Sequence, residues 1–229
     1  MRKGWQLVAT NEIDALTVTK LHLLPPTNAK EQGIEELNPR DTPKLCRSWL
    51  RPCATAGAAK LSIGVNYGTV ADNLPPPSRV AEFIQSQTTI DRVKIFDANP
   101  DVLRAFADSD VSVTVAVANA DIPAVAKLPA TQSWVANNVL PFFRQTRIRR
   151  IAVGNEVVAT SDKRLIACLL PAMKGLHSAL SAAGIMNVEV SSPHSMGILS
   201  TSDPPSSGRF RRGYDQVIFA SILDFHRQT

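Results

Sequence analysis

The sequence lacks several patterns that would assign a protein class directly. It has no apolar run long enough to cross a membrane. Neither phosphate-binding glycine pattern, G-x-G-x-x-G or G-x-x-x-x-G-K-[ST], follows any of its apolar runs. We therefore expect no transmembrane segment and no nucleotide-binding loop.

Cysteine is scarce as well. The three cysteines, Cys46, Cys53 and Cys168, show no metal-ligand spacing to any histidine. These three residues therefore give no sign of a metal site. Cys46 and Cys53 could pair as a disulfide, but we favour three unpaired thiols, with Cys168 inside a helix.

The charge is positive but not organised as a binding surface. The net charge is +5, yet residues 61–229 hold sixteen Lys/Arg against fourteen Asp/Glu. No Lys/Arg stripe with interleaved aromatic residues is present, so we expect no nucleic-acid binding. The arginines at positions 144, 147, 149 and 150 surround a helix-to-strand loop, where we expect a solvated face.

Residues 1–60 differ from the rest of the chain. Prolines at positions 25, 26, 39, 43 and 52 interrupt any regular element there. The chain begins with basic residues but has no following apolar segment, so it shows no recognisable signal peptide. We expect residues 1–60 to form an irregular, poorly ordered N-terminal extension.

Residues 61–229 read as repeated strand–helix units. Strands are predicted to begin near residues 61, 91, 111, 148 and 187, each followed by a helix, and Gly184 is expected to end the fourth of these helices. The last helix is expected over residues 214–225, with Val217, Ile218 and Phe225 on its apolar face. Such repeats require a parallel sheet, either an open doubly wound sheet or part of a (β/α)8 barrel.

Polar residues follow the predicted strands one after another. They are Asn66 and Tyr67, then Asp97, Asn119, Asn155 and Glu156, and finally Ser192 and His194. The carboxyl ends of parallel strands meet at one edge, and barrel enzymes place their active sites there. The missing phosphate loops and this polar ring favour the barrel over the open sheet.

Five short motifs occur in order along residues 61–229. They are Ile63-Gly-Val-Asn-Tyr-Gly68, Asn73-Leu-Pro-Pro-Pro77, Arg92-Val-Lys-Ile-Phe-Asp97, Val153-Gly-Asn-Glu156 and Pro204-Pro-Ser-Ser-Gly-Arg-Phe210. Together they resemble the plant members of glycoside hydrolase family 17, the glucan endo-1,3-β-glucosidases. The resemblance covers about residues 61–229 and does not touch residues 1–60. It implies an α/β fold of the (β/α)8 TIM-barrel type, with about five of the eight βα units present.

The resemblance also implies an activity and roles for individual residues. The family cleaves internal β-1,3 linkages of callose- or laminarin-type glucans with retention of configuration, without a cofactor or metal. Glu156 matches the acid/base. Asn155 matches the residue that holds the sugar beside the scissile bond, and Tyr67 matches a residue lining the cleft. Asp97 and Asn119 match strand-end positions of the cleft.

One part of the family pattern has no match. The nucleophile of the family is a second Glu in a Glu-x-Gly-Trp-Pro-like motif on the seventh strand, and this sequence contains no such motif. Asp97, Glu189 and Asp203 are poor substitutes because none lies at the family's position. We expect a truncated gene product that is poorly soluble and lacks glucanase activity.

Two functional alternatives remain open: a β-1,3-glucan hydrolase scaffold, and an inactive fragment or β-glucan-binding protein. The resemblance implies secretion to the cell wall or the outer plasma membrane. Nothing in the sequence predicts an oligomeric state.

Overall fold

A computed structural model describes residues 8–10 and 62–229. In this part of the chain, six strands form one sheet in the order β1-β2-β3-β4-β5-β6. Strands β2 (Gly64–Tyr67), β3 (Arg92–Ile95), β4 (Ser112–Val117), β5 (Ile148–Val153) and β6 (Glu189–Ser191) run parallel to one another. The predicted series of five βα units, a partial (β/α)8 barrel, is confirmed.

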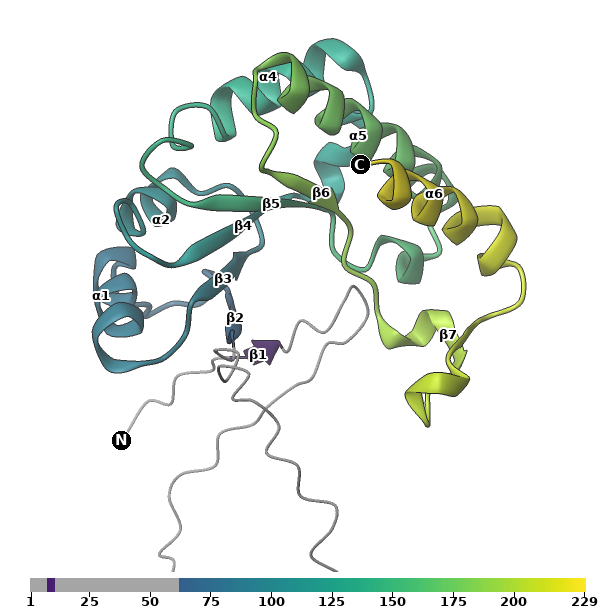
Figure 1. The fold of residues 1–229 in the computed structure, drawn as a ribbon, viewed down its shortest axis with the longest axis horizontal. Helices are drawn as coiled ribbons and strands as arrows, with labels where there is room; N and C mark the ends of the chain where they lie inside the picture. Colours follow the sequence, from purple (N-terminus) through teal and green to yellow (C-terminus); the bar gives the residue numbers. More distant parts are fainter. Residues whose placement is uncertain (1–7, 11–61) are drawn as a thin grey trace, which may run out of the picture. The chain divides into compact units, whose positions relative to one another are not determined.

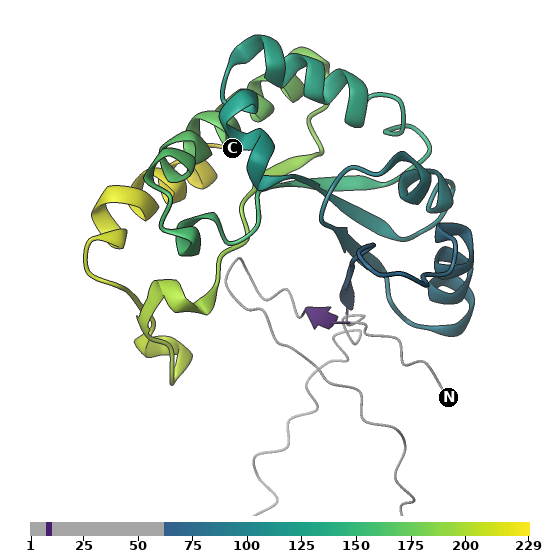
Figure 2. The same ribbon diagram turned by 180° about the vertical axis from the view of Figure 1, so that it is seen from behind.

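The helices alternate with these strands along the chain. They are α1 (Pro77–Gln87), α2 (Pro100–Ala105), α3 (Ile122–Val125), α4 (Leu128–Asn138), α5 (Lys163–Ala182) and α6 (Ala220–Gln228). Figure 1 shows α1, α2 and α4 along one side of the curved sheet, and Figure 2 shows the same arrangement from behind.

Local side-chain chemistry explains where the helices begin and end. The carboxamide oxygen of Asn99 accepts hydrogen bonds from the backbone N–H groups of Asp101 (2.9 Å) and Val102 (3.4 Å), which caps α2. Asp162 caps α5 in the same way. Gly184 follows α5 with a φ of 74°, a left-handed conformation that glycine adopts without strain.

The core lies between the central strands and α5. Val113, Val115 and Val117 of β4 are at most 1% exposed, whereas Ser112 and Thr114 keep partial exposure. The alternation of valine with small residues therefore gives the strand one fully buried face. The apolar face of α5 is buried in the same cluster through Leu169, Ala172, Met173, Leu176, Ala179 and Leu180.

A short strand from the N-terminal region joins the sheet. Strand β1 (Val8–Thr10) pairs antiparallel with β2, so that Val8 lies opposite Asn66. The remainder of the predicted extension, with Cys46 and Cys53, lies outside the described residues. Cys168 is a free thiol in α5.

The prediction for the last helix was wrong in one respect. Val217 is 78% exposed, and the buried residues are Phe219, Ile222 and Phe225. The helix starts with a π-helical segment, Asp215–Phe219, before α6. A π-helix turns through a smaller angle per residue than an α-helix, so the period of 3.6 residues misplaces the apolar face. A hairpin of β7 (Leu199–Thr201) and β8 (Arg209–Phe210) precedes this segment.

Candidate active site at the carboxyl ends of the strands

Strand β5 ends in a turn that only glycine can make. Gly154 has a φ of 71°. A Cβ atom at this position would lie 2.7 Å from Asn119 Oδ1 and 2.7 Å from Ile122 Cδ1, and closer still to the Val157 side chain. The chain can therefore pass close to the end of β4 only without a side chain at position 154.

Asn119 fixes the backbone of Asn155. The Asn155 backbone N–H donates to Asn119 Oδ1 (2.7 Å), and Asn119 Nδ2 donates back to the Asn155 carbonyl oxygen (3.1 Å). The carboxamide of Asn119 therefore forms hydrogen bonds with both the N–H and the carbonyl oxygen of Asn155. The structure assigns Asn119 a direct part in holding the site together.

Glu156 is an exposed carboxylate on a strained backbone. Its φ and ψ are 51° and 37°, in the left-handed region that side-chain-bearing residues seldom adopt. Its N–H donates to the carbonyl oxygen of Pro193 (3.1 Å), and its own carbonyl oxygen accepts from Ala159 N–H (2.9 Å). These bonds hold the strained conformation, and such strain is concentrated at functional sites in proteins.

The segment after β6, residues 192–194, packs against the end of β5 and the turn that carries Glu156. Ser192 Oγ donates to the carbonyl oxygen of Val153 (2.9 Å). His194 packs edge-on against Phe219, with ring centroids 4.9 Å apart, and Phe210 stacks on the same phenyl ring. Burial, and secondly the charge of His226, lower the pKa of His194 to about 4, so its ring is neutral at pH 7.

Both ring nitrogens of His194 are buried and have no hydrogen-bond partner within the described ranges. Its surroundings fit a packed aromatic position beside Phe219 better than a group that contacts a ligand.

Lys94 reaches the site from β3. Its Nζ donates to Asn155 Oδ1 (3.1 Å) and lies 3.9 Å from the centroid of the Phe96 ring. Burial lowers the pKa of Lys94 to about 8, and the nearby charge of Glu156 acts in the opposite direction. A partly desolvated ammonium group therefore lies beside the Asn155–Glu156 pair.

Tyr67 and Asp97 take less exposed places. Tyr67 is 7% exposed and lies beside Ile95 in the register of β2 and β3. Burial raises the pKa of its phenol. One carboxylate oxygen of Asp97 accepts from Asn99 N–H (3.1 Å), and its backbone carbonyl oxygen accepts from Ala116 N–H. Their contact with a sugar stays a prediction.

The structure brings together Lys94, Asn119, Asn155 and Glu156, of which the last three were predicted from the sequence. Lys94 and Phe96 were missed. The sequence signal that could have found Lys94 is the alternation of side chains along β3. Val93 and Ile95 are buried, so Lys94 lies on the opposite face of the sheet. A lysine inside a strand of a parallel sheet is unusual and needs a partner.

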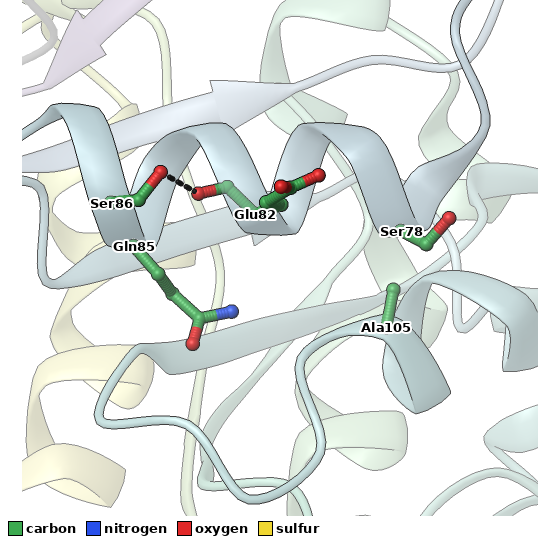
Figure 3. Close-up of a pocket in the computed structure, with 5 residues that line it drawn as sticks. All are labelled: Ser78, Glu82, Gln85, Ser86 and Ala105. Atoms are coloured by element: carbon green, nitrogen blue, oxygen red, sulfur yellow. Dashed lines mark hydrogen bonds between the residues drawn. The ribbon is translucent and has the colours of Figure 1, made fainter.

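Other features of the described part lie away from this site. A surface hollow lies on the outer helices α1 and α2, lined by Ser78, Glu82, Gln85, Ser86 and Ala105 (Figure 3). Among the described residues, no group of three or more His, Cys, Asp or Glu side chains could hold a metal ion.

One described helix, α5, is long and apolar enough to cross a membrane. Its apolar face packs into the domain core.

A partial barrel of βα units with a polar cluster at the carboxyl ends of its strands has the arrangement of a (β/α) barrel enzyme. Comparison with known proteins identifies the family. Residues 63–229 match the family described as glycosyl hydrolases family 17. The chain belongs to this family of glycoside hydrolases.

The proteins similar to this chain include two plant enzymes. A glucan endo-1,3-beta-glucosidase of Triticum aestivum is 45% identical over 77% of this chain and 39% of its own length. Glucan endo-1,3-beta-glucosidase 7 of Arabidopsis thaliana is 44% identical over 73% of this chain and 33% of its own length. The chain therefore spans well under half the length of these two relatives.

A solved structure agrees with the fold. CJP38, a beta-1,3-glucanase and pollen allergen of Cryptomeria japonica, superposes with a TM-score of 0.68 at 39% identity. The superposition covers 72% of this chain and 52% of CJP38.

Proposed function

We propose that the chain carries the acid/base half of an endo-1,3-β-glucan hydrolase site, with Glu156 as the acid/base. The observation that carries the proposal is the geometry of Glu156. It is an exposed carboxylate on a strained turn at the carboxyl end of β5, held by Pro193 and flanked by the fixed backbone of Asn155. The names of the similar enzymes support β-1,3-glucan as the substrate.

The chemistry is a double displacement. In the first step, a nucleophilic carboxylate bonds to the anomeric carbon while the C–O bond to the departing glucan breaks, and Glu156 gives its proton to that oxygen. In the second step, the Glu156 carboxylate takes a proton from water, whose oxygen attacks the anomeric carbon and releases the carboxylate. Asn155 holds the sugar, and Asp97, Asn119 and Tyr67 shape the surroundings.

Two described carboxylates are poor candidates for the nucleophile. Glu189 pairs with Arg150, three residues before the end of β5, and a strand advances about 3.3 Å per residue. That pair lies about 10 Å below the strand's end, whereas a retaining enzyme needs its carboxyl groups about 5–5.5 Å apart. Asp97 caps its own turn through Asn99. We propose that neither is the nucleophile, and that turnover needs a carboxylate from elsewhere.

Binding and an external nucleophile test this proposal separately. Nuclear magnetic resonance (NMR) titration with laminaripentaose should shift the signals of Asn155 and Glu156. Incubation with laminarin and azide should yield an α-configured glycosyl azide, because azide takes the place of the second carboxylate while Glu156 protonates the leaving oxygen. Glu156→Gln should abolish this product, and Glu82→Gln, on the exposed face of α1, should not.

Each other outcome has a defined meaning. Binding without any azide product would favour the alternative, a non-catalytic β-glucan-binding protein. Hydrolysis without azide that Glu156→Gln abolishes would support Glu156 and contradict the need for an external carboxylate. Absence of both binding and product would contradict the proposed function. Secretion to the cell wall stays a separate proposal from the family resemblance.

A further inference from the structure

Three of the four grouped side chains have a role in the scheme above, but Lys94 has none. We propose that Lys94 is a positioning residue that turns the Asn155 carboxamide so that its NH₂ group faces the substrate and that keeps a positive charge beside the Glu156 carboxylate. The inference rests on the proposed function of Asn155 and Glu156, and it adds the direction of the hydrogen bond that the sugar receives.

The position of Lys94 in the sheet explains how its ammonium group contacts Asn155. In the register of the parallel strands it lies beside Asn66 of β2 and Thr114 of β4. Its strand neighbours Val93 and Ile95 are each 1% exposed and point into the core. The Lys94 side chain is therefore directed to the other face of the sheet, and its ammonium group bonds to a residue at the end of β5.

Two contacts hold the ammonium group in place. The Phe96 ring, two residues along the same strand, lies 3.9 Å from Nζ, within the range of a cation–π interaction. Asn155 Oδ1 lies 3.1 Å from the same nitrogen. An aromatic face and an amide oxygen thus replace part of the water that burial removes from the lysine.

The charge of Lys94 decides how the Asn155 amide points. A lysine ammonium group has three donors and no acceptor, so it can face only the oxygen of the carboxamide. The Asn155 backbone is already fixed by Asn119, which leaves rotation of the side chain as its main freedom. With its oxygen bonded to Lys94, Asn155 offers N–H donors, so the sugar oxygen at this position must act as an acceptor.

The same charge supports proton transfer by Glu156. When Glu156 gives its proton to the leaving oxygen, a negative charge develops on its carboxylate. A fixed ammonium group nearby stabilises that charge without reorganisation, and its effect is larger in a partly desolvated site than in water. The attraction between Glu156 and Lys94 also opposes the lowering of the Lys94 pKa by burial. The two groups are therefore coupled.

Side-chain NMR on the full chain tests the geometry without any substrate. The Lys94 Cε signal should titrate with a midpoint near 8. In Glu156→Gln the midpoint should fall further, because the attraction that favours the charged lysine is removed. The NH₂ signals of Asn155 should move in Lys94→Met and stay in place in Lys94→Arg, which keeps a donor. A Lys94 midpoint near the ordinary value of about 10.5, unchanged by Glu156→Gln, would contradict the inference.

Affinity for laminaripentaose gives an independent readout. Lys94→Met keeps the apolar stem of the side chain but removes the donor, and should weaken binding about tenfold. Lys94→Arg should stay within about threefold of the unchanged chain. Lys174→Met, on an exposed position of α5, should bind normally. Equal losses in Lys94→Met and Lys94→Arg, or no loss in either, would overturn the positioning role.

The two proposals fail in different ways. If the unchanged chain does not bind laminaripentaose, the proposed function is contradicted. The Lys94 titration and the Asn155 amide signals then still decide whether Lys94 orients the carboxamide.

Discussion

The two ends of β5 use charged residues in opposite ways. At the amino end, Arg147 pairs with Asp110 (3.2 Å) and Arg150 with Glu189 (2.6 Å), and each acidic partner is well exposed to solvent. At the carboxyl end, Glu156 lies on a strained turn, and its nearby cation, Lys94, is directed to Asn155 and is partly desolvated. The amino end of β5 therefore carries ordinary surface ion pairs, whereas its carboxyl end carries a constrained polar cluster.

The two ends of β5 differ in what their charged groups cost the fold. Exposed ion pairs contribute little free energy because water and salt screen them. A strained backbone and a desolvated cation cost free energy, and they persist only where the surroundings enforce them. In barrel enzymes the carboxyl ends of the strands carry the chemistry, and the costly groups of β5 lie at that end.

The largest effect should come from the glycine that makes the turn before Glu156. Gly154→Ala should lower the free energy of unfolding by about 3 kcal/mol, because the methyl group would overlap Asn119 and Ile122 on a left-handed backbone. Gly184→Ala is the matched control: its φ is 74°, but no atom lies within 4 Å of the added Cβ. Its cost should be only about 1 kcal/mol, measured by urea denaturation. Equal costs would show that backbone conformation alone matters at Gly154.

The second prediction concerns His194, next to the Pro193 that bonds Glu156, and the pH dependence of the free energy of unfolding. The folded-state pKa of His194 is lowered to about 4, against an ordinary value of 6.5. Between these values the unfolded chain binds a proton that the folded chain does not, so the free energy of unfolding falls as the pH drops from 6.5 to 4. The loss attributable to His194 should approach about 3 kcal/mol.

His194→Phe keeps an aromatic ring beside Phe219 and removes the titrating group. The difference in unfolding free energy between this variant and the unchanged chain should therefore change with pH across that window and level off above it. A difference that is the same at pH 4.5 and pH 7 would contradict the burial of a neutral His194.

The smallest effect should come from the amino end of β5. Glu189→Gln removes the charge that faces Arg150, and should lower the free energy of unfolding by less than about 1 kcal/mol, with less effect at high salt. Binding of laminaripentaose should be unchanged. A loss of binding comparable to that of Lys94→Met would contradict the division between the two ends of the strand.

Much of the fold could be predicted because its signals are local. The apolar runs that begin near residues 61, 91, 111, 148 and 187 form the five parallel strands, and Gly184 ends α5 as predicted. The last helix was harder to predict, because the π-helical turn at Asp215–Phe219 shifts the buried face and exposes Val217.

The sequence alone determined that an Asn-Glu pair follows a buried strand in a series of βα units. It also determined which family's motifs the chain carries. Only the tertiary structure decided what surrounds that pair. Lys94 and Asn119 lie 61 and 36 positions away from Asn155 in the sequence, and no periodicity of a single strand encodes such contacts. Parallel strands place their ends side by side whatever the length of the connecting helices, so the partners of Asn155 come together only when the sheet forms.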